Sequence, residues 1–136
     1  MTTTCLIGEA DPFLARLLER FGKASELTVV RAKVGQELLN LARALKPDVI
    51  VVDPELPGTL RGWEAVRAIR SDSRLEHIPV LTCSWLSEAD AWALTGDADG
   101  HLQKPELHYA DFIAALANVG QSTPLLSMCL GDPAPV

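Results

Sequence analysis

Residues 48–53, with the sequence Asp-Val-Ile-Val-Val-Asp, decide the fold class of this chain. The run is rich in β-branched residues and too short for a typical helix, so it predicts a strand buried on both faces. The stretch 54–58, which contains two prolines and a glycine, then ends the strand. In an open parallel sheet, ligands and chemistry gather beyond the carboxyl ends of the strands. Asp53 is therefore a candidate nucleophile or cation ligand, and the alternative is a loop or capping residue.

Three further apolar runs end in side chains that can carry chemistry. The first ends in Glu9, the next in Ser84, and the last in Lys104 followed by a proline. Together with Asp53, they place acid, acid, hydroxyl and lysine at four successive strand ends. We expect these four side chains to converge on one pocket at one rim of the sheet.

Helix patterns alternate with the strands, which predicts repeated strand–helix units and a parallel sheet. Asp11 is placed to be the N-cap of the first helix, with Pro12 in its first turn. On the second helix, Leu38 and Leu45 are expected to face the core. The expected helices cover residues 12–23, 35–45, 62–71, 87–95 and 108–119, and the second strand covers residues 27–30.

The composition narrows the class of protein. A chain of 136 residues that is 48% hydrophobic suits one domain with a packed core. The net charge of −6, without a basic cluster, argues against a nucleic-acid surface. The apolar runs are too short to span a membrane, and the N-terminus lacks the features of a signal peptide. The three cysteines fit no zinc pattern, and we expect a reducing, cytoplasmic location.

The order of these strand-end residues resembles the receiver domain of bacterial two-component response regulators. The resemblance covers roughly residues 4–119. It implies an α/β fold with a doubly wound, five-stranded parallel sheet of flavodoxin-like (receiver) topology, in strand order 2-1-3-4-5. We expect residues 1–120 to form the receiver domain, and residues 121–136, which contain several prolines, to be a C-terminal tail or linker stump.

The resemblance also implies a chemistry for the site. Asp53 would accept a phosphoryl group from a histidine kinase or a phosphotransfer protein. Mg²⁺ would be held by Glu9, Asp53 and the backbone carbonyl of Glu55. Lys104 would reach the phosphoryl group as a point charge, and Ser84 would hydrogen-bond the modified aspartate and trigger a switch. The Lys104–Pro105 bond is expected to be cis, as it is in the family.

Three positions, 10, 85 and 101, differ from the family pattern. Ala10 stands where the family normally has a second acid that binds the metal, so we expect Mg²⁺ to bind weakly or not at all. Trp85 follows Ser84 where family members usually have a small residue, and its indole either covers the site or packs on the fourth helix. His101 stands at the position of the family's switching aromatic residue and is expected to act with Ser84 in the switch.

Two functions follow from the resemblance. The first is a receiver that takes a phosphoryl group on Asp53 and switches the binding of a downstream protein. The alternative is a pseudo-receiver, a protein-interaction module that works without phosphorylation. Neither is an enzyme beyond catalysing its own phosphorylation and dephosphorylation. Neither binds nucleic acid or a membrane through this chain, and the family often forms homodimers through its last two helices and strand.

A third function, of a different class, is a flavodoxin-like small-molecule binder. It would need a phosphate-cradling loop of small residues after the first strand. The acids of residues 9–11 would instead repel phosphate and attract cations.

Overall fold

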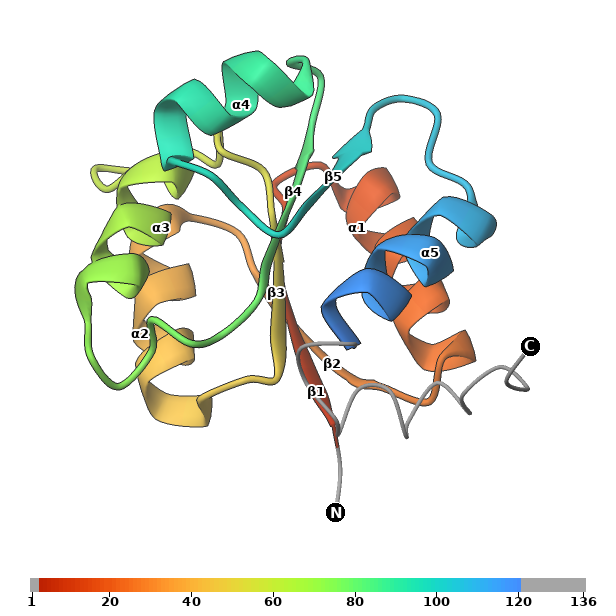
Figure 1. Cartoon of the computed structure of the whole chain (residues 1–136), viewed down its shortest axis with the longest axis horizontal. Coiled ribbons are helices and arrows are strands. Elements are labelled where there is room, and N and C mark those ends of the chain that lie inside the picture. Colours follow the sequence, from red (N-terminus) through yellow and green to blue (C-terminus); the bar gives the residue numbers. More distant parts are fainter. Residues whose placement is uncertain (1–2, 121–136) are drawn as a thin grey trace.

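The computed structural model describes residues 3–120, which form a parallel sheet with helices on both faces (Figure 1). Strands and helices alternate along the whole of this part of the chain. The elements are β1 Thr4–Gly8, α1 Pro12–Ala24, β2 Thr28–Ala32, α2 Gly35–Leu45, β3 Val49–Val52, α3 Gly62–Ser71, β4 Val80–Ser84, α4 Glu88–Thr95, β5 Gly100–Gln103 and α5 Tyr109–Gly120. The expected tail, residues 121–136, lies outside the described residues.

The five strands are parallel and lie in the order β2-β1-β3-β4-β5, which confirms the predicted topology. Helices α1 and α5 cover one face of the sheet, and α2 and α3 cover the other (Figure 1). Helix α4 lies beyond α3 at the end of the sheet where β4 terminates. The chain reverses its direction across the sheet at β1 and β3, and a crevice at such a switch point is where doubly wound sheets bind ligands.

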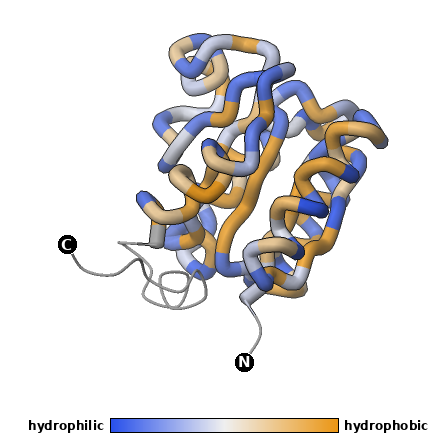
Figure 2. The backbone as a smooth tube through the Cα atoms, turned by 90° about the vertical axis from the view of Figure 1, so that its right-hand side faces the viewer, coloured by the Kyte–Doolittle hydropathy of each residue, from blue (hydrophilic) through white to orange (hydrophobic). Residues whose placement is uncertain are grey.

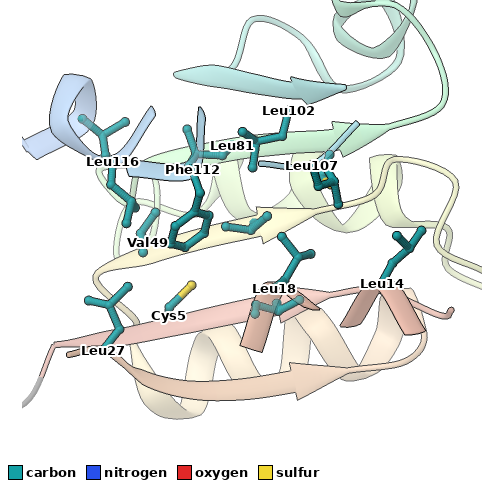
Figure 3. Close-up of a cluster of buried hydrophobic side chains, with 14 residues drawn as sticks. Cys5, Leu14, Leu18, Leu27, Val49, Leu81, Leu102, Leu107, Phe112 and Leu116 are labelled. Atoms are coloured by element: carbon teal, nitrogen blue, oxygen red, sulfur yellow. The ribbon is translucent and has the colours of Figure 1, made fainter. Parts of the chain in front are cut away.

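Strand β3 runs through the centre of the molecule, and each of its four residues is fully buried. Because side chains alternate along a strand, Val49 and Val51 join the cluster under α1 and α5, whereas Ile50 and Val52 join the cluster under α2 and α3. Figure 2 shows the hydrophobic strands inside the molecule, and Figure 3 shows Val49 beside Phe112 in the first cluster. The prediction of a strand buried on both faces is confirmed.

Local chemistry explains where the first helix begins and how closely it packs. Asp11 is the N-cap of α1, and its carboxylate accepts hydrogen bonds from the backbone of Phe13 and Leu14. Near the other end of the helix, a Cβ at Gly22 would lie 2.5 Å from a methyl carbon of Val29. Glycine at this position therefore allows α1 to approach β2 closely.

Cys5 and Cys83 are free thiols inside the sheet. Burial raises the pKa of each to about 12, so both act as small apolar side chains. Within residues 3–120 no helix is long and apolar enough to cross a membrane.

Several element boundaries and one helix face differ from the prediction. Strand β2 covers residues 28–32 rather than 27–30, because an edge strand is held by pairing with β1 rather than by its own apolar pattern. On α2, Leu38 is buried as predicted, but Leu45 in the last turn is 43% exposed, and Leu39 is buried instead. The core-facing stripe of α2 is therefore wider at its start than at its end.

Candidate functional site

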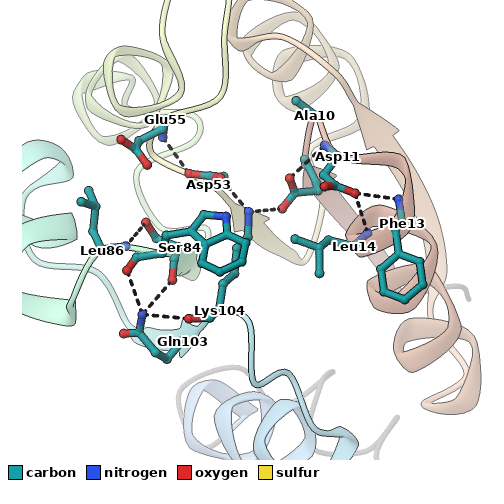
Figure 4. A network of polar contacts seen from close by, with 12 residues as sticks. Ala10, Asp11, Phe13, Leu14, Asp53, Glu55, Ser84, Leu86, Gln103 and Lys104 are labelled. Carbon is teal, nitrogen blue, oxygen red and sulfur yellow. Dashed lines mark hydrogen bonds and ion pairs between the residues drawn. The ribbon is translucent and has the colours of Figure 1, made fainter.

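The predicted strand-end side chains of Glu9, Asp53 and Lys104 are in contact at one rim of the sheet. Figure 4 shows Ser84 at the same rim, beside Asp53 and Lys104. Glu9 follows β1, Asp53 follows β3, Ser84 ends β4 and Lys104 follows β5. All four residues are buried, with exposed fractions of 2%, 8%, 0% and 3%. Their convergence arises because the carboxyl ends of parallel strands lie at the same edge of the sheet.

Lys104 lies between two carboxylates. Its Nζ donates a hydrogen bond of 2.7 Å to Asp53 Oδ2 and forms an ion pair of 2.6 Å with Glu9 Oε1. The contact between Lys104 and Glu9 is short enough for an ion pair, but its geometry is not that of a hydrogen bond. Burial alone would lower the pKa of Lys104, but the contacts with the two carboxylates outweigh burial and raise that pKa. The ammonium is therefore charged at neutral pH and neutralises part of the negative charge of the pocket.

The Asp53 carboxylate is oriented at both oxygens. Oδ1 accepts a hydrogen bond of 2.8 Å from the backbone N–H of Glu55, while Oδ2 faces Lys104. The start of α3 packs against the backbone at this point, because a Cβ at Gly62 would collide with the Asp53 carbonyl oxygen. The side chain keeps 11% of its surface exposed, which leaves a path for a reactant.

Glu9 is fixed by its own loop and by an arginine on β2. Its Oε2 accepts a hydrogen bond of 3.1 Å from the backbone of Asp11, and its carbonyl accepts one of 3.0 Å from Arg31 Nε. Arg31 also donates to the carbonyl of Ala10. Because the Asp11 side chain caps α1, it does not replace the acid that Ala10 lacks.

The oxygens available to a cation are the Glu9 and Asp53 carboxylates and the Glu55 carbonyl predicted beside them. Oxygen donors of this kind suit Mg²⁺, which is usually held by one or two carboxylates and several waters. Ala10 adds no ligand, and residues 3–120 contain no cluster of three or more acids, histidines or cysteines that could hold a metal. Lys104 already pairs with both carboxylates and neutralises part of their charge. The residues present therefore fit a weak Mg²⁺ site.

Ser84 and Trp85 form the β4 side of the pocket. Ser84 Oγ accepts a hydrogen bond of 2.9 Å from the backbone of Leu86, so the hydroxyl keeps its own proton for another acceptor. The Trp85 side chain follows at the start of the loop to α4 and is 58% exposed. More than half of Trp85 therefore lies in solvent.

His101 lies on β5 directly opposite Thr82 of β4. Its Nδ1 is 2.7 Å from the Thr82 hydroxyl, which also accepts a hydrogen bond from Trp92 of α4. Its Nε2 is 3.2 Å from Gln103 Oε1. The half-buried imidazole is thus linked to β4 directly and to α4 through Thr82.

Three of these residues were not predicted from the sequence: Thr82, Trp92 and Gln103. The available signal was polarity, because Thr82 interrupts an apolar run and Gln103 is a polar residue next to the predicted site residue Lys104. The Lys104–Pro105 peptide bond is cis, as predicted.

An open groove lies beside the site, between α4, β5 and α5. Its volume is about 820 Å³, and its lining includes Trp92 and His101. Four carboxylates also line it, from Glu88, Asp99, Glu106 and Asp111.

A family model of the response regulator receiver domain matches residues 5–117. The chain therefore belongs to the response regulator receiver family, and it is a receiver domain of two-component signalling. Among its relatives, the polar-differentiation response regulator DivK of Brucella ovis is 32% identical over 99 residues, which cover 73% of this chain and 75% of DivK.

Solved structures of lower identity show the same fold. The chemotaxis response regulator CheY4 of Vibrio cholerae aligns with a TM-score of 0.77 at 23% identity, over 88% of this chain and 99% of that one. The receiver domain of a Pseudomonas aeruginosa sensor histidine kinase aligns with a TM-score of 0.72 at 20% identity, over 96% and 99% of the two chains. That structure has a magnesium ion coordinated in its active-site cleft.

Proposed function

We propose that this receiver domain accepts a phosphoryl group on Asp53 and that the modification changes which protein it binds. The observation that carries the proposal is the 2.7 Å hydrogen bond between Lys104 Nζ and a nearly buried Asp53 carboxylate at the end of β3. The donor is the phosphohistidine of a histidine kinase or of a phosphotransfer protein.

The transfer needs little from the protein besides orientation and charge. A carboxylate oxygen of Asp53 forms the new P–O bond while the P–N bond of the donor breaks, and the imidazole nitrogen leaves with the bonding electron pair. Lys104 remains charged and pairs with the phosphoryl oxygens as negative charge accumulates between the carboxylates. Mg²⁺, when bound, would be held by Glu9, Asp53 and the Glu55 carbonyl, and it would neutralise more of the negative charge.

Ser84 is the residue that would report the modification. In the unmodified site its oxygen accepts from Leu86, and its proton is available to a phosphoryl oxygen. Donation of this proton would draw the β4–α4 loop towards Asp53, and His101 on the neighbouring strand would follow. The result would be a population shift at the surface formed by α4, β5 and α5.

The domain acts by binding rather than by turnover, and we propose residues 1–120 as the receiver unit and residues 121–136 as its tail or linker. A cytoplasmic location suits the two buried free thiols.

The groove between α4, β5 and α5 is the surface we assign to the downstream partner. Asp99 already pairs with Arg70, and the other three carboxylates, from Glu88, Glu106 and Asp111, favour a partner segment that carries lysine or arginine. The same charge opposes a symmetric homodimer through this face.

A fluorescence titration tests whether the pocket takes a phosphoryl group. Beryllofluoride, a phosphoryl mimic, is added with millimolar Mg²⁺ to the wild-type protein, and Trp85→Phe gives the emission of Trp63 and Trp92 as background. We expect a saturable change, and we expect Asp53→Asn to abolish it. The absence of any saturable change in the parent protein would favour the pseudo-receiver instead.

A further inference from the structure

Gln103 connects the end of β4, at Ser84, with the loop that carries Lys104. It is the last residue of β5, and its side chain extends over the ends of both strands (Figure 4). Its Nε2 lies 3.1 Å from the carbonyl oxygens of Ser84 and Trp85 and 3.2 Å from that of Lys104. One side-chain amide therefore bridges the β4–α4 loop and the β5–α5 loop.

The carbonyls determine the direction of the hydrogen bonds around this amide. Carbonyl oxygens only accept, so the atom that faces them is the NH₂ group, and Gln103 Oε1 is left facing His101. An amide oxygen also only accepts, so His101 Nε2, at 3.2 Å, carries a hydrogen. In a neutral imidazole the other nitrogen, Nδ1, is then an acceptor.

The hydrogen bonds continue from His101 to α4. Because Nδ1 of His101 accepts, the Thr82 hydroxyl at 2.7 Å donates to it. The Thr82 oxygen in turn accepts the indole N–H of Trp92 at 2.9 Å. The other acceptor near the hydroxyl, the Gly100 carbonyl, is farther away at 3.3 Å. Thr82 is fully buried, so water does not replace these contacts.

The hydrogen bonds thus form one directed series, which we call the relay: Trp92, Thr82, His101 and Gln103, ending at the carbonyls of Ser84, Trp85 and Lys104. Hydrogen bonds in series polarise one another, and a change at one end alters the rest. The Gln103 side chain itself is exposed, so water can replace its bonds at small cost in stability. Its effect is expected on the geometry of the site rather than on folding.

We propose that Gln103 is a positioning residue for Ser84 and Lys104. It adds to the 2.8 Å hydrogen bond from the backbone N–H of Lys104 to the Ser84 carbonyl in fixing the separation of these two segments, and through the relay it couples that separation to Trp92 on α4. The positioning of Lys104 for phosphoryl transfer rests on the proposed function, whereas the relay itself does not. Gln103 acts independently of the Ser84 hydroxyl, because its side chain binds the backbone carbonyls of Ser84 and Lys104.

The histidine tautomer tests the relay in the unmodified protein. Two-bond ¹H–¹⁵N correlation spectra at a pH where the imidazole is neutral distinguish a hydrogen on Nε2 from one on Nδ1. We expect the Nε2–H form for His101, with the exposed His77 and His108 as internal references. A hydrogen on Nδ1 would overturn the relay.

Two substitutions test the role of Gln103. Gln103→Leu removes the amide, and Gln103→Glu keeps its length but presents a carboxylate to the carbonyls. Both should shift the Trp92 indole N–H resonance, although no hydrogen bond joins residues 92 and 103 directly. Both should also slow labelling of Asp53 by phosphoramidate several-fold. The matched control is Gln36→Leu, at an exposed glutamine that pairs with Asn40 along α2.

The outcomes separate the two claims. If the wild-type protein is not labelled on Asp53, the proposed function fails, while the Trp92 and His101 signals still test the relay. If the wild type is labelled and both Gln103 variants label at the rate of Gln36→Leu, Gln103 does not position the site. An unmoved Trp92 resonance in both Gln103 variants would contradict the coupling to α4.

Discussion

The two halves of the site are held by different forces. Glu9 and Asp53, which follow β1 and β3, are buried charges that meet the single cation of Lys104. On β4 and β5, by contrast, neutral side chains are joined by hydrogen bonds, and several of them are half-buried or exposed. Unpaired charges in a buried pocket are costly, whereas water can replace many neutral hydrogen bonds.

The charged half carries the phosphoacceptor chemistry, and the hydrogen-bonded half carries the switch that reports it. The charged half needs only strand ends at one sheet edge, and it follows the family pattern apart from Ala10. The hydrogen-bonded half contains Thr82, Trp92 and Gln103, which the family resemblance did not predict. The readout can therefore differ between receivers while the phosphoacceptor chemistry is retained.

The largest effect on this comparison should come from Lys104→Met. The change leaves two buried carboxylates without their cation, and we expect the free energy of unfolding to fall by about 3–5 kcal/mol at pH 7. Urea unfolding measures the loss. Adding Glu9→Gln should restore part of it, and Lys33→Met, at an exposed lysine, should cost little. A Lys104→Met protein as stable as Lys33→Met would show that the ion pairs do not hold the charged half.

Lys104 should also make the stability of the protein depend on pH in the alkaline range. The pKa of Lys104 is raised in the folded protein, so its contribution to stability is fully present below the unfolded value of about 10.4. The contribution is lost as pH rises through the folded pKa. The stability difference between wild type and Lys104→Met, measured by urea unfolding, should therefore be constant from neutral pH upward and then shrink above about pH 10.4. A difference that grows there would contradict the assignment.

The hydrogen-bonded half should respond more weakly, and Thr82→Val is its clearest test. The isosteric change removes the hydroxyl that serves Trp92 and His101, and we expect a loss of about 1–3 kcal/mol in unfolding free energy. Chemical denaturation gives this value. Thr28→Val, at an exposed threonine of β2, serves as the matched change. Equal stability of the two variants would mean that the buried hydroxyl contributes nothing specific.

The smallest expected effect comes from restoring the second acid, which is missing from the charged half at Ala10. Ala10→Asp adds a hard ligand, and we expect Mg²⁺ affinity to rise about tenfold, or about 1.4 kcal/mol. Isothermal titration calorimetry with Mg²⁺ measures it. Ala44→Asp adds the same charge on the last turn of α2 and should leave the affinity near that of wild type. If both variants bind equally, position 10 does not belong to the acid pair.

Much of the fold and of the charged half could be predicted from the sequence. The valine-rich run before Asp53 indicated a central strand, and alternation with helices implied the sheet edge at which Lys104 and Glu9 converge. The relay could not be predicted, because it depends on the register that places Thr82 opposite His101 and on the rotamer of Trp92. Leu45 was misplaced because the helical period does not show where the last turn of α2 leaves the core.

Intact-mass measurement after incubation with phosphoramidate and Mg²⁺ tests the central claim most directly. The donor contains the same kind of P–N bond as phosphohistidine and needs no partner protein. We predict that the wild-type chain gains one phosphoryl group, that peptide mapping places it on Asp53, and that Asp53→Asn gains none. A wild-type chain that stays unmodified, or one that Asp53→Asn matches, would contradict the account.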